Sequence, residues 1–352
     1  MKLKKLATVL LAGCMLLTTA CGTTTGDNQV KDTEISSEVI GVEDTGEATY
    51  PITITHAFGE TIITEKPENI VTLGWGNQDV PLALGVVPVG VSMANFGPVN
   101  EDGLLAWTAE KFGELGVESP NVFSDVDGWD YEAISNANPD VILAAYSGFS
   151  QEEYDMLSQI APVVAYPTAA WSTDWREMTI TNAKAMGMEA EGQKLVEDMD
   201  ALIAEKLKEY PDVEGKTAAF AWMSAEDLSV FYIYLTTDPR ADFLLDLGLK
   251  FPASVEVMIE NESDFSITVS SEYANQLSDI DILITYGDEN LLEALQADPL
   301  FSEIPAVKNG AVLLLDPTTD LSASSTPSIL SIPATLDEYL SLLQEAAVKG
   351  NE

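Results

Sequence analysis

The feature that most constrains the fold is a short apolar segment, residues 141–145 (VILAA), which stands between two helical stretches. Asn138-Pro139 ends the helix predicted over residues 131–137, because a residue before proline is pushed out of the α region. An apolar run without alternation predicts a strand buried on both faces, as in a parallel sheet covered by helices. The sequence therefore predicts an α/β fold. Tyr146 begins the loop at the carboxyl end of this strand, where open α/β sheets bind ligands.

The same order of elements returns near the C-terminus. Residues 271–286 (SEYANQLSDIDILITY) run from a glutamate through a predicted helix and an aspartate to an apolar strand that ends on a tyrosine, as residues 131–146 do. Between these repeats, residues 189–210 predict a helix of about 20 residues, which spans roughly 30 Å. We therefore expect two Rossmann-like lobes, over residues 49–172 and 212–349. Connecting helices over residues 173–211 join them.

The N-terminus has the features of a targeting segment. Three lysines precede an apolar core over residues 6–19, which is too short to span a membrane, and small residues precede Cys21. The pattern resembles a bacterial lipoprotein signal, so we expect residues 1–20 to be removed and Cys21 to be lipidated at the outer face of the cell membrane. Cys14 as the lipidated residue and an ordinary secretory signal are the alternatives. Residues 21–48, rich in Thr, Gly, Ser and acids, predict a flexible tether.

The charge and residue usage exclude several classes of function. With 58 acidic against 16 basic residues, the net charge is −42, which argues against binding nucleic acid or docking on anionic lipid through charge. Because Cys14 and Cys21 both precede the folded part, that part has no disulfide, thiolate metal site or cysteine nucleophile. His56 is the single histidine, so a dedicated zinc or manganese site is not expected. Haem held by a tyrosine stays open.

An ordered set of segments resembles the iron–siderophore and vitamin B12 substrate-binding proteins of bacterial ABC importers. It includes residues 52–73 (ITITHAFGETIITEKPENIVTL), 131–148 (YEAISNANPDVILAAYSG) and 299–312 (PLFSEIPAVKNGAV), and the resemblance covers about residues 50–348. The resemblance implies a rigid helix between the lobes, a ligand in the cleft between them, and delivery to an ABC permease and its ATPase. The expected ligand is a ferric siderophore bound by a monomer. Vitamin B12 and haem are the alternatives.

A binder of this type holds its ligand by aromatic stacking and a few polar groups. Tryptophans and tyrosines at or just beyond strand ends are therefore candidate contacts, and the resemblance places the Trp107 loop at the cleft as well. Arg240 is the expected anchor, since its planar fork donates paired hydrogen bonds to oxygens; the alternative is an ion pair with Asp242 or another acid. The chain has only two arginines, Arg176 and Arg240, which favours a hydroxamate or nearly neutral chelate over a trianionic one. The candidate contacts are Trp75, Trp107, Tyr146, Trp171, Trp222, Tyr232, Tyr234 and Arg240.

Glu132 and Glu272 stand at matching positions in the two repeats. The resemblance implies that one glutamate from each lobe pairs with arginines of the permease, although a glutamate in a first helical turn also suits the helix dipole. An enzyme is not expected, because no G-x-S-x-G elbow, phosphate-binding loop or H-E-x-x-H pattern occurs. A hydrolase that uses only carboxylates, and an adhesion or structural lipoprotein, are the remaining alternatives.

Overall fold

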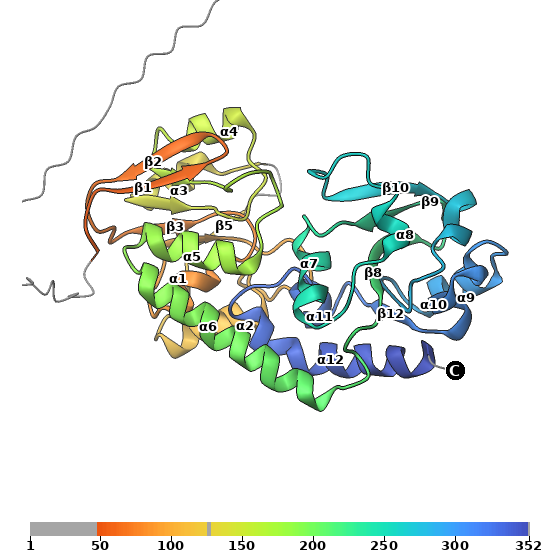
Figure 1. Ribbon diagram of the computed structural model, residues 1–352. Helices are drawn as coiled ribbons and strands as arrows, with labels where there is room; N and C mark the ends of the chain where they lie inside the picture. Colours follow the sequence, from red (N-terminus) through yellow and green to blue (C-terminus); the bar gives the residue numbers. More distant parts are fainter. Residues whose placement is uncertain (1–47, 125–127, 351–352) are drawn as a thin grey trace, which may run out of the picture. The chain divides into compact units, whose positions relative to one another are not determined.

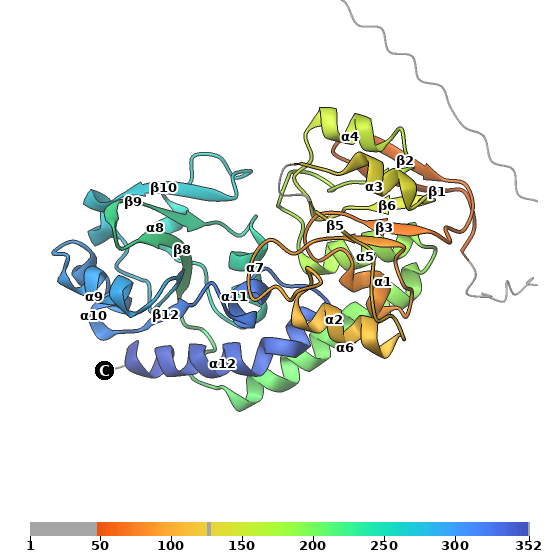
Figure 2. The ribbon, with the colours of Figure 1, turned by 180° about the vertical axis from the view of Figure 1, so that it is seen from behind.

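The computed structural model describes residues 48–124 and 128–350 (Figures 1 and 2). These residues fall within one compact unit, Gly46–Glu352. The predicted signal peptide, Cys21 and nearly all of the predicted tether lie outside the described residues. Within the described ranges no helix is long and apolar enough to cross a membrane.

The first sheet is parallel throughout, as the unbroken apolar runs predict. Its order is β5-β4-β3-β6-β7, and its strands are short and buried because helices cover both faces. Helices α3 and α4 pack on one face, and α1, α2 and α5 (Trp175–Ala185) pack on the other (Figures 1 and 2). The bounds are β3 Ile70–Thr72, β4 Gly90–Ser92, β5 Val122–Phe123, β6 Val141–Leu143, β7 Val163–Val164, α1 Asp79–Ala83, α2 Ala106–Glu114, α3 Tyr131–Asn136 and α4 Gln151–Leu157.

A separate hairpin precedes this sheet, as the turn residues predict. Strands β1 (Ile52–His56) and β2 (Gly59–Ile63) pair antiparallel through a turn at Gly59, whose φ of +124° suits glycine. The His56 ring contacts the hydroxyl of Thr61 at 2.9 Å, and that hydroxyl donates to the carbonyl of Val163 in β7. The single histidine is therefore a structural residue that ties the hairpin to the first sheet.

The second sheet is mixed, in the order β10-β9-β8-β11-β12. Strands β8, β11 and β12 pair in parallel, while β9 pairs antiparallel with both of its neighbours, β8 and β10. Helices α7 and α12 pack on one face, and α8, α9 and α10 pack on the other. The bounds are β8 Ala218–Ser224, β9 Asp227–Tyr234, β10 Ser266–Ser270, β11 Ile282–Tyr286, β12 Val312–Leu315, α7 Pro239–Asp246, α8 Ala253–Glu256, α9 Glu289–Ala297, η3 Phe301–Glu303, α10 Pro305–Asn309, α11 Asp320–Ser324 and α12 Ser331–Gly350.

The sequence repeat hides one difference between the sheets. An α-helix is predicted from Ser270, but the structure has the edge strand β10 followed by a 3₁₀-helix, η2 (Ser271–Gln276). The segment SITVS holds β-branched residues, and pairing with β9 supplies backbone partners that periodicity does not reveal.

Two helices connect the sheets in sequence, α5 (Trp175–Ala185) and α6 (Glu189–Lys206), the latter continued by η1 (Leu207–Glu209). Asp174 caps α5 by accepting from the backbone N–H groups of Arg176 and Glu177. Gly187, at φ +70°, separates the two helices.

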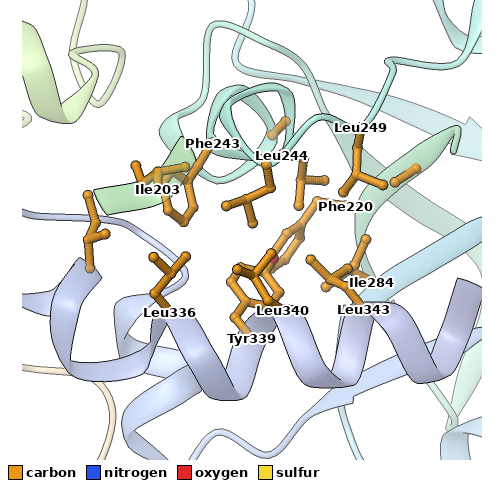
Figure 3. Packing of buried hydrophobic residues seen from close by; sticks show 14 of the residues in the cluster. Ile203, Phe220, Phe243, Leu244, Leu249, Ile284, Leu336, Tyr339, Leu340 and Leu343 are labelled. Carbon is orange, nitrogen blue, oxygen red and sulfur yellow. The ribbon is translucent and has the colours of Figure 1, made fainter. Parts of the chain in front are cut away.

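The largest core cluster joins α6 to the second sheet (Figure 3). Leu336, Tyr339, Leu340 and Leu343 of α12 lie toward Phe220 of β8, together with Phe243 and Leu244 of α7 and Ile203 of α6. Burying each large apolar side chain contributes about 1.5–3 kcal/mol. The long connecting helix is therefore packed into this core along its apolar stripe, which makes it part of the folded body.

Candidate ligand-binding site

A cavity of about 540 Å³ lies at the carboxyl ends of strands from both sheets. From the first sheet it is lined by loops that follow β3, β4, β6 and β7, and from the second by residues in or after β8, β9, β11 and β12 and by the residue before β10. Its walls are mostly aromatic, as suits a large ligand held by stacking. The lining residues are Gly74, Trp75, Met93, Asn95, Phe96, Tyr146, Trp171, Trp222, Tyr234, Asp238, Arg240, Phe265, Tyr286, Pro317 and Thr326.

Six of the eight candidate contacts meet in this cavity, although up to 165 positions separate Trp75 from Arg240 in the sequence. They are Trp75, Tyr146, Trp171, Trp222, Tyr234 and Arg240. A wider hollow of about 730 Å³ lies over α5 and α7, but its walls are mainly charged and polar, so it offers no stacking surface. We therefore take the aromatic cavity as the candidate site.

Trp171 has an unusual backbone for a bulky residue, with φ of +59°. Its backbone N–H donates to the carbonyl of Ser147 at 3.0 Å. Its ring contacts the Tyr146 ring edge-on, with 5.3 Å between the centroids. A Cβ on Gly148 would stand 2.1 Å from Trp171 Nε1, so only glycine leaves room for the ring. The ring is 41% exposed. Backbone strain that holds a large exposed aromatic over a cavity is typical of a ligand-contacting residue.

The buried amide of Asn77 fixes the loops that carry Trp75 and Tyr146. Its Nδ2 donates to the carbonyls of Leu73 and Tyr146, each at 2.8 Å, and more weakly to that of Trp75 at 3.3 Å. Its Oδ1 accepts from the backbone N–H of Tyr146 at 3.2 Å and from Asn182 Nδ2 at 2.9 Å. Sequence reasoning missed Asn77; its position directly after Gly74-Trp75-Gly76 was the available signal.

Arg240 enters the cavity wall already paired. Its Nε donates to Asp238 Oδ1 at 2.8 Å, and its Nη2 donates to Asp238 Oδ2 at 2.6 Å. The guanidinium also lies over the Tyr234 ring, 3.7 Å from the centroid. The alternative of an ion pair therefore holds, with Asp238 in place of Asp242. Asp238 itself was missed, although its capping position before Pro239 marked it as a helix start.

Apart from this pair, the polar side chains that line the cavity carry hydroxyl, amide or indole groups. Burial raises the pKa of the Tyr146 phenol, and the carboxylate of Asp238 raises it further. Burial likewise raises the pKa of Tyr234. The Tyr286 hydroxyl shares a 2.7 Å hydrogen bond with Ser325. Tyr146 and Tyr234 are therefore neutral phenols at physiological pH, suited to hydrogen bonding.

Trp107 lies away from the cavity. It is buried in α2, and its Nε1 donates to Asp79 Oδ2 at 3.0 Å. Thr108 and Gln78 also donate to Asp79 Oδ1, at 2.8 and 3.2 Å, and Ser328 donates to Oδ2. Burial raises the pKa of Asp79 to about 6, against the effect of these donors. The indole is thus drawn inward because a buried carboxylate needs hydrogen-bond donors.

Tyr232 lies beside the cavity without lining it. Its ring contacts that of Trp222 at 5.8 Å between centroids, and it is 39% exposed. Tyr232 and Trp222 stand opposite each other on neighbouring strands, so both face the same side of the sheet.

Glu132 and Glu272 are exposed in the first turns of α3 and η2. Asp130 caps α3 by accepting from Ala133, so capping does not require Glu132. Within the described residues, no three His, Cys, Asp or Glu side chains are grouped so as to hold a metal ion.

The sequence pattern of the periplasmic binding protein family matches residues 70–319. The chain belongs to this family. It is 49% identical to PiaA of Streptococcus pneumoniae TIGR4, whose crystal structure in complex with ferrichrome covers 85% of this chain and 99% of that one, with a TM-score of 0.81. PiaA is described as the substrate-binding protein of an iron uptake ABC transporter.

The chain also matches more distant proteins. The chain is 24% identical over 305 residues to the ferric-anguibactin-binding protein FatB of Vibrio anguillarum, covering 82% of this chain and 87% of that one. A periplasmic solute binding protein of Mycobacterium smegmatis is 26% identical, with a TM-score of 0.67, over 86% of this chain and all of that one. The predicted fold class is therefore confirmed, and the relatives are binding proteins.

Proposed function

We propose that this protein captures a ferric siderophore outside the cytoplasm and delivers it to an ABC permease and its ATPase. The observation that carries the proposal is the aromatic cavity at the strand ends of both sheets, in a chain 49% identical to a protein crystallised with ferrichrome. A cavity of about 540 Å³ takes part of a large chelate and leaves the rest at its mouth.

The chemistry of the walls favours a hydroxamate chelate of iron(III). Ferrichrome is such a chelate and has no net charge. Apolar packing against the rings of Trp75, Trp171 and Trp222 holds an organic ligand without needing charge, and Arg240 supplies a planar donor for hydroxamate oxygens. Binding does not require a resident metal, because the iron arrives as cargo within the chelate.

The direct test is a titration of the chain from residue 22 onward with ferrichrome, followed by tryptophan fluorescence. We expect quenching with a dissociation constant of about 1 µM or tighter. Iron-free ferrichrome is the matched control, and haem and vitamin B12 complete the panel. Mass spectrometry should recover the ligand unchanged, because the protein binds and does not catalyse. Tight binding of haem or B12 with no response to ferrichrome would replace the proposal with one of those ligands.

The exposed positions of Glu132 and Glu272 support a docking role toward the permease. Reversing both residues to lysine should abolish iron uptake in cells while ferrichrome binding to the purified protein is retained. Unchanged uptake by the double variant would remove the docking role. Lipid attachment at Cys21 is part of the same proposal, and metabolic labelling with a fatty acid, compared between the native chain and Cys21→Ser, tests it.

A further inference from the structure

The charged side chains that line the cavity are one carboxylate and one guanidinium, Asp238 and Arg240. Asp238 is fully buried, and the Arg240 side chain is 19% exposed. The cavity wall is therefore electrically balanced before any ligand arrives, in a protein whose net charge is −42.

The geometry keeps this balance in place. Asp238 engages Arg240 through both carboxylate oxygens, at 2.8 and 2.6 Å, and also accepts from the Arg240 backbone N–H at 2.9 Å. The Tyr234 ring supports the other face of the guanidinium at 3.7 Å. Asp238 thus both caps α7 and neutralises the cation, and these two roles can be separated by mutation.

Binding of an anionic ligand at this wall is unfavourable in either of two arrangements. To take Arg240 as its counter-ion, it must compete with Asp238, and a buried carboxylate stripped of its partner is strongly destabilising. If Asp238 stays paired, the anion lies beside a carboxylate in a desolvated site, where like charges repel more strongly than in water. An uncharged chelate meets neither cost, because its oxygens accept hydrogen bonds without displacing Asp238.

We propose that Asp238 is a specificity-determining residue, which masks the charge of Arg240 so that the cavity accepts uncharged ferric chelates and rejects anionic ones. This inference rests on the proposed function, since it describes how the same cavity selects among ferric siderophores.

The test compares two ferric chelates built on one cyclic peptide, ferrichrome and an analogue whose hydroxamate substituents carry carboxylates. Asp238→Asn and Asp238→Ser remove the negative charge, while both residues still cap a helix. Asp242→Asn is the matched control, because it removes the same charge from the same first turn of α7 but lies outside the cavity lining. Affinity comes from fluorescence titration, and folding from circular dichroism.

The native protein should bind ferrichrome more tightly than the carboxylated analogue. Both Asp238 variants should lower the ratio of the ferrichrome affinity to the analogue affinity by roughly tenfold or more, which corresponds to a change of about 1.4 kcal/mol in the difference between the two binding free energies. Asp242→Asn should leave the ratio as it is. An unchanged ratio in both Asp238 variants overturns the inference, including the case in which both chelates weaken equally. Equal narrowing by Asp242→Asn also overturns it, because net charge alone then decides selectivity. If the native protein binds neither chelate, it is the proposed function that fails.

Discussion

The two walls of the cavity are held in place by different chemistry. On the side of the first sheet, neutral hydrogen bonds from Asn77 hold the loops of Trp75 and Tyr146. On the side of the second sheet, a salt bridge holds Arg240 against Tyr234. The wall from the first sheet therefore fixes the shape of the site, and the wall from the second sheet fixes its charge.

The largest effect is expected when the charged wall loses its cation. Arg240→Ala leaves the buried carboxylate of Asp238 without its counter-ion, which should lower the free energy of unfolding by about 3 kcal/mol. Urea unfolding measures the change. Adding Asp238→Asn to Arg240→Ala should restore part of the loss, because the unpaired charge is then gone. A double variant no more stable than the single one would show that the salt bridge does not hold this wall.

On the neutral wall, Asn77→Leu should lower the free energy of unfolding by about 2–3 kcal/mol, because it strips partners from several buried backbone groups. Its binding of ferrichrome and of the charged analogue should weaken by the same factor, since the shape changes and the charge does not. Asn182→Leu is the control and should cost less, because it removes only one of the bonds to Asn77. A change in the ratio of the two affinities would contradict the division between the walls.

Asp79 shows what a buried carboxylate does without a cation. Its folded pKa of about 6 lies above the ordinary value of 3.8, so the folded state binds a proton more readily than the unfolded state. Stability linked to Asp79 should therefore rise as pH falls from about 7 to 4, by about 2 kcal/mol. Asp79→Asn should lack this contribution in urea unfolding measured across the same pH range. Equal slopes for the two proteins would show that Asp79 is not the group responsible.

A smaller effect separates ligand contact from stability. Trp171→Ala should weaken ferrichrome binding about tenfold through lost apolar contact with the indole ring, with little change in the free energy of unfolding. Trp171→Gly should weaken ferrichrome binding by the same factor. It should also raise the free energy of unfolding relative to Trp171→Ala, because glycine adopts the φ of +59° without strain. Tyr232→Ala is the control for the neighbouring exposed aromatic and should leave binding within about twofold. A larger loss for Tyr232→Ala than for Trp171→Ala would move the contact surface from Trp171 to the neighbouring pair Trp222 and Tyr232.

Local patterns predicted the elements well where neighbours in sequence decide the structure. The hairpin around Gly59, the cap at Asp174 and the buried strands β6 and β11 follow from turn chemistry, capping and apolar runs. Aromatics placed at strand ends come together because parallel strands present their carboxyl ends at one edge of a sheet. Trp75, Tyr146 and Trp222 lie in the cavity for that reason.

The sequence by itself therefore determined the fold class and most of the aromatic lining of the site. Tertiary structure decided the polar partners. Trp107 turns inward to Asp79, and Ser328 reaches the same carboxylate across 249 positions of sequence. Arg240 pairs with Asp238 and not with Asp242. Asp238 is the capping residue before α7, so its carboxylate folds back onto the first turn, whereas Arg240 and Asp242 are two residues apart within the helix and do not face each other. Burial makes such pairings obligatory, since an unpaired polar group in the interior is costly, yet only the packed chain brings the partners within reach.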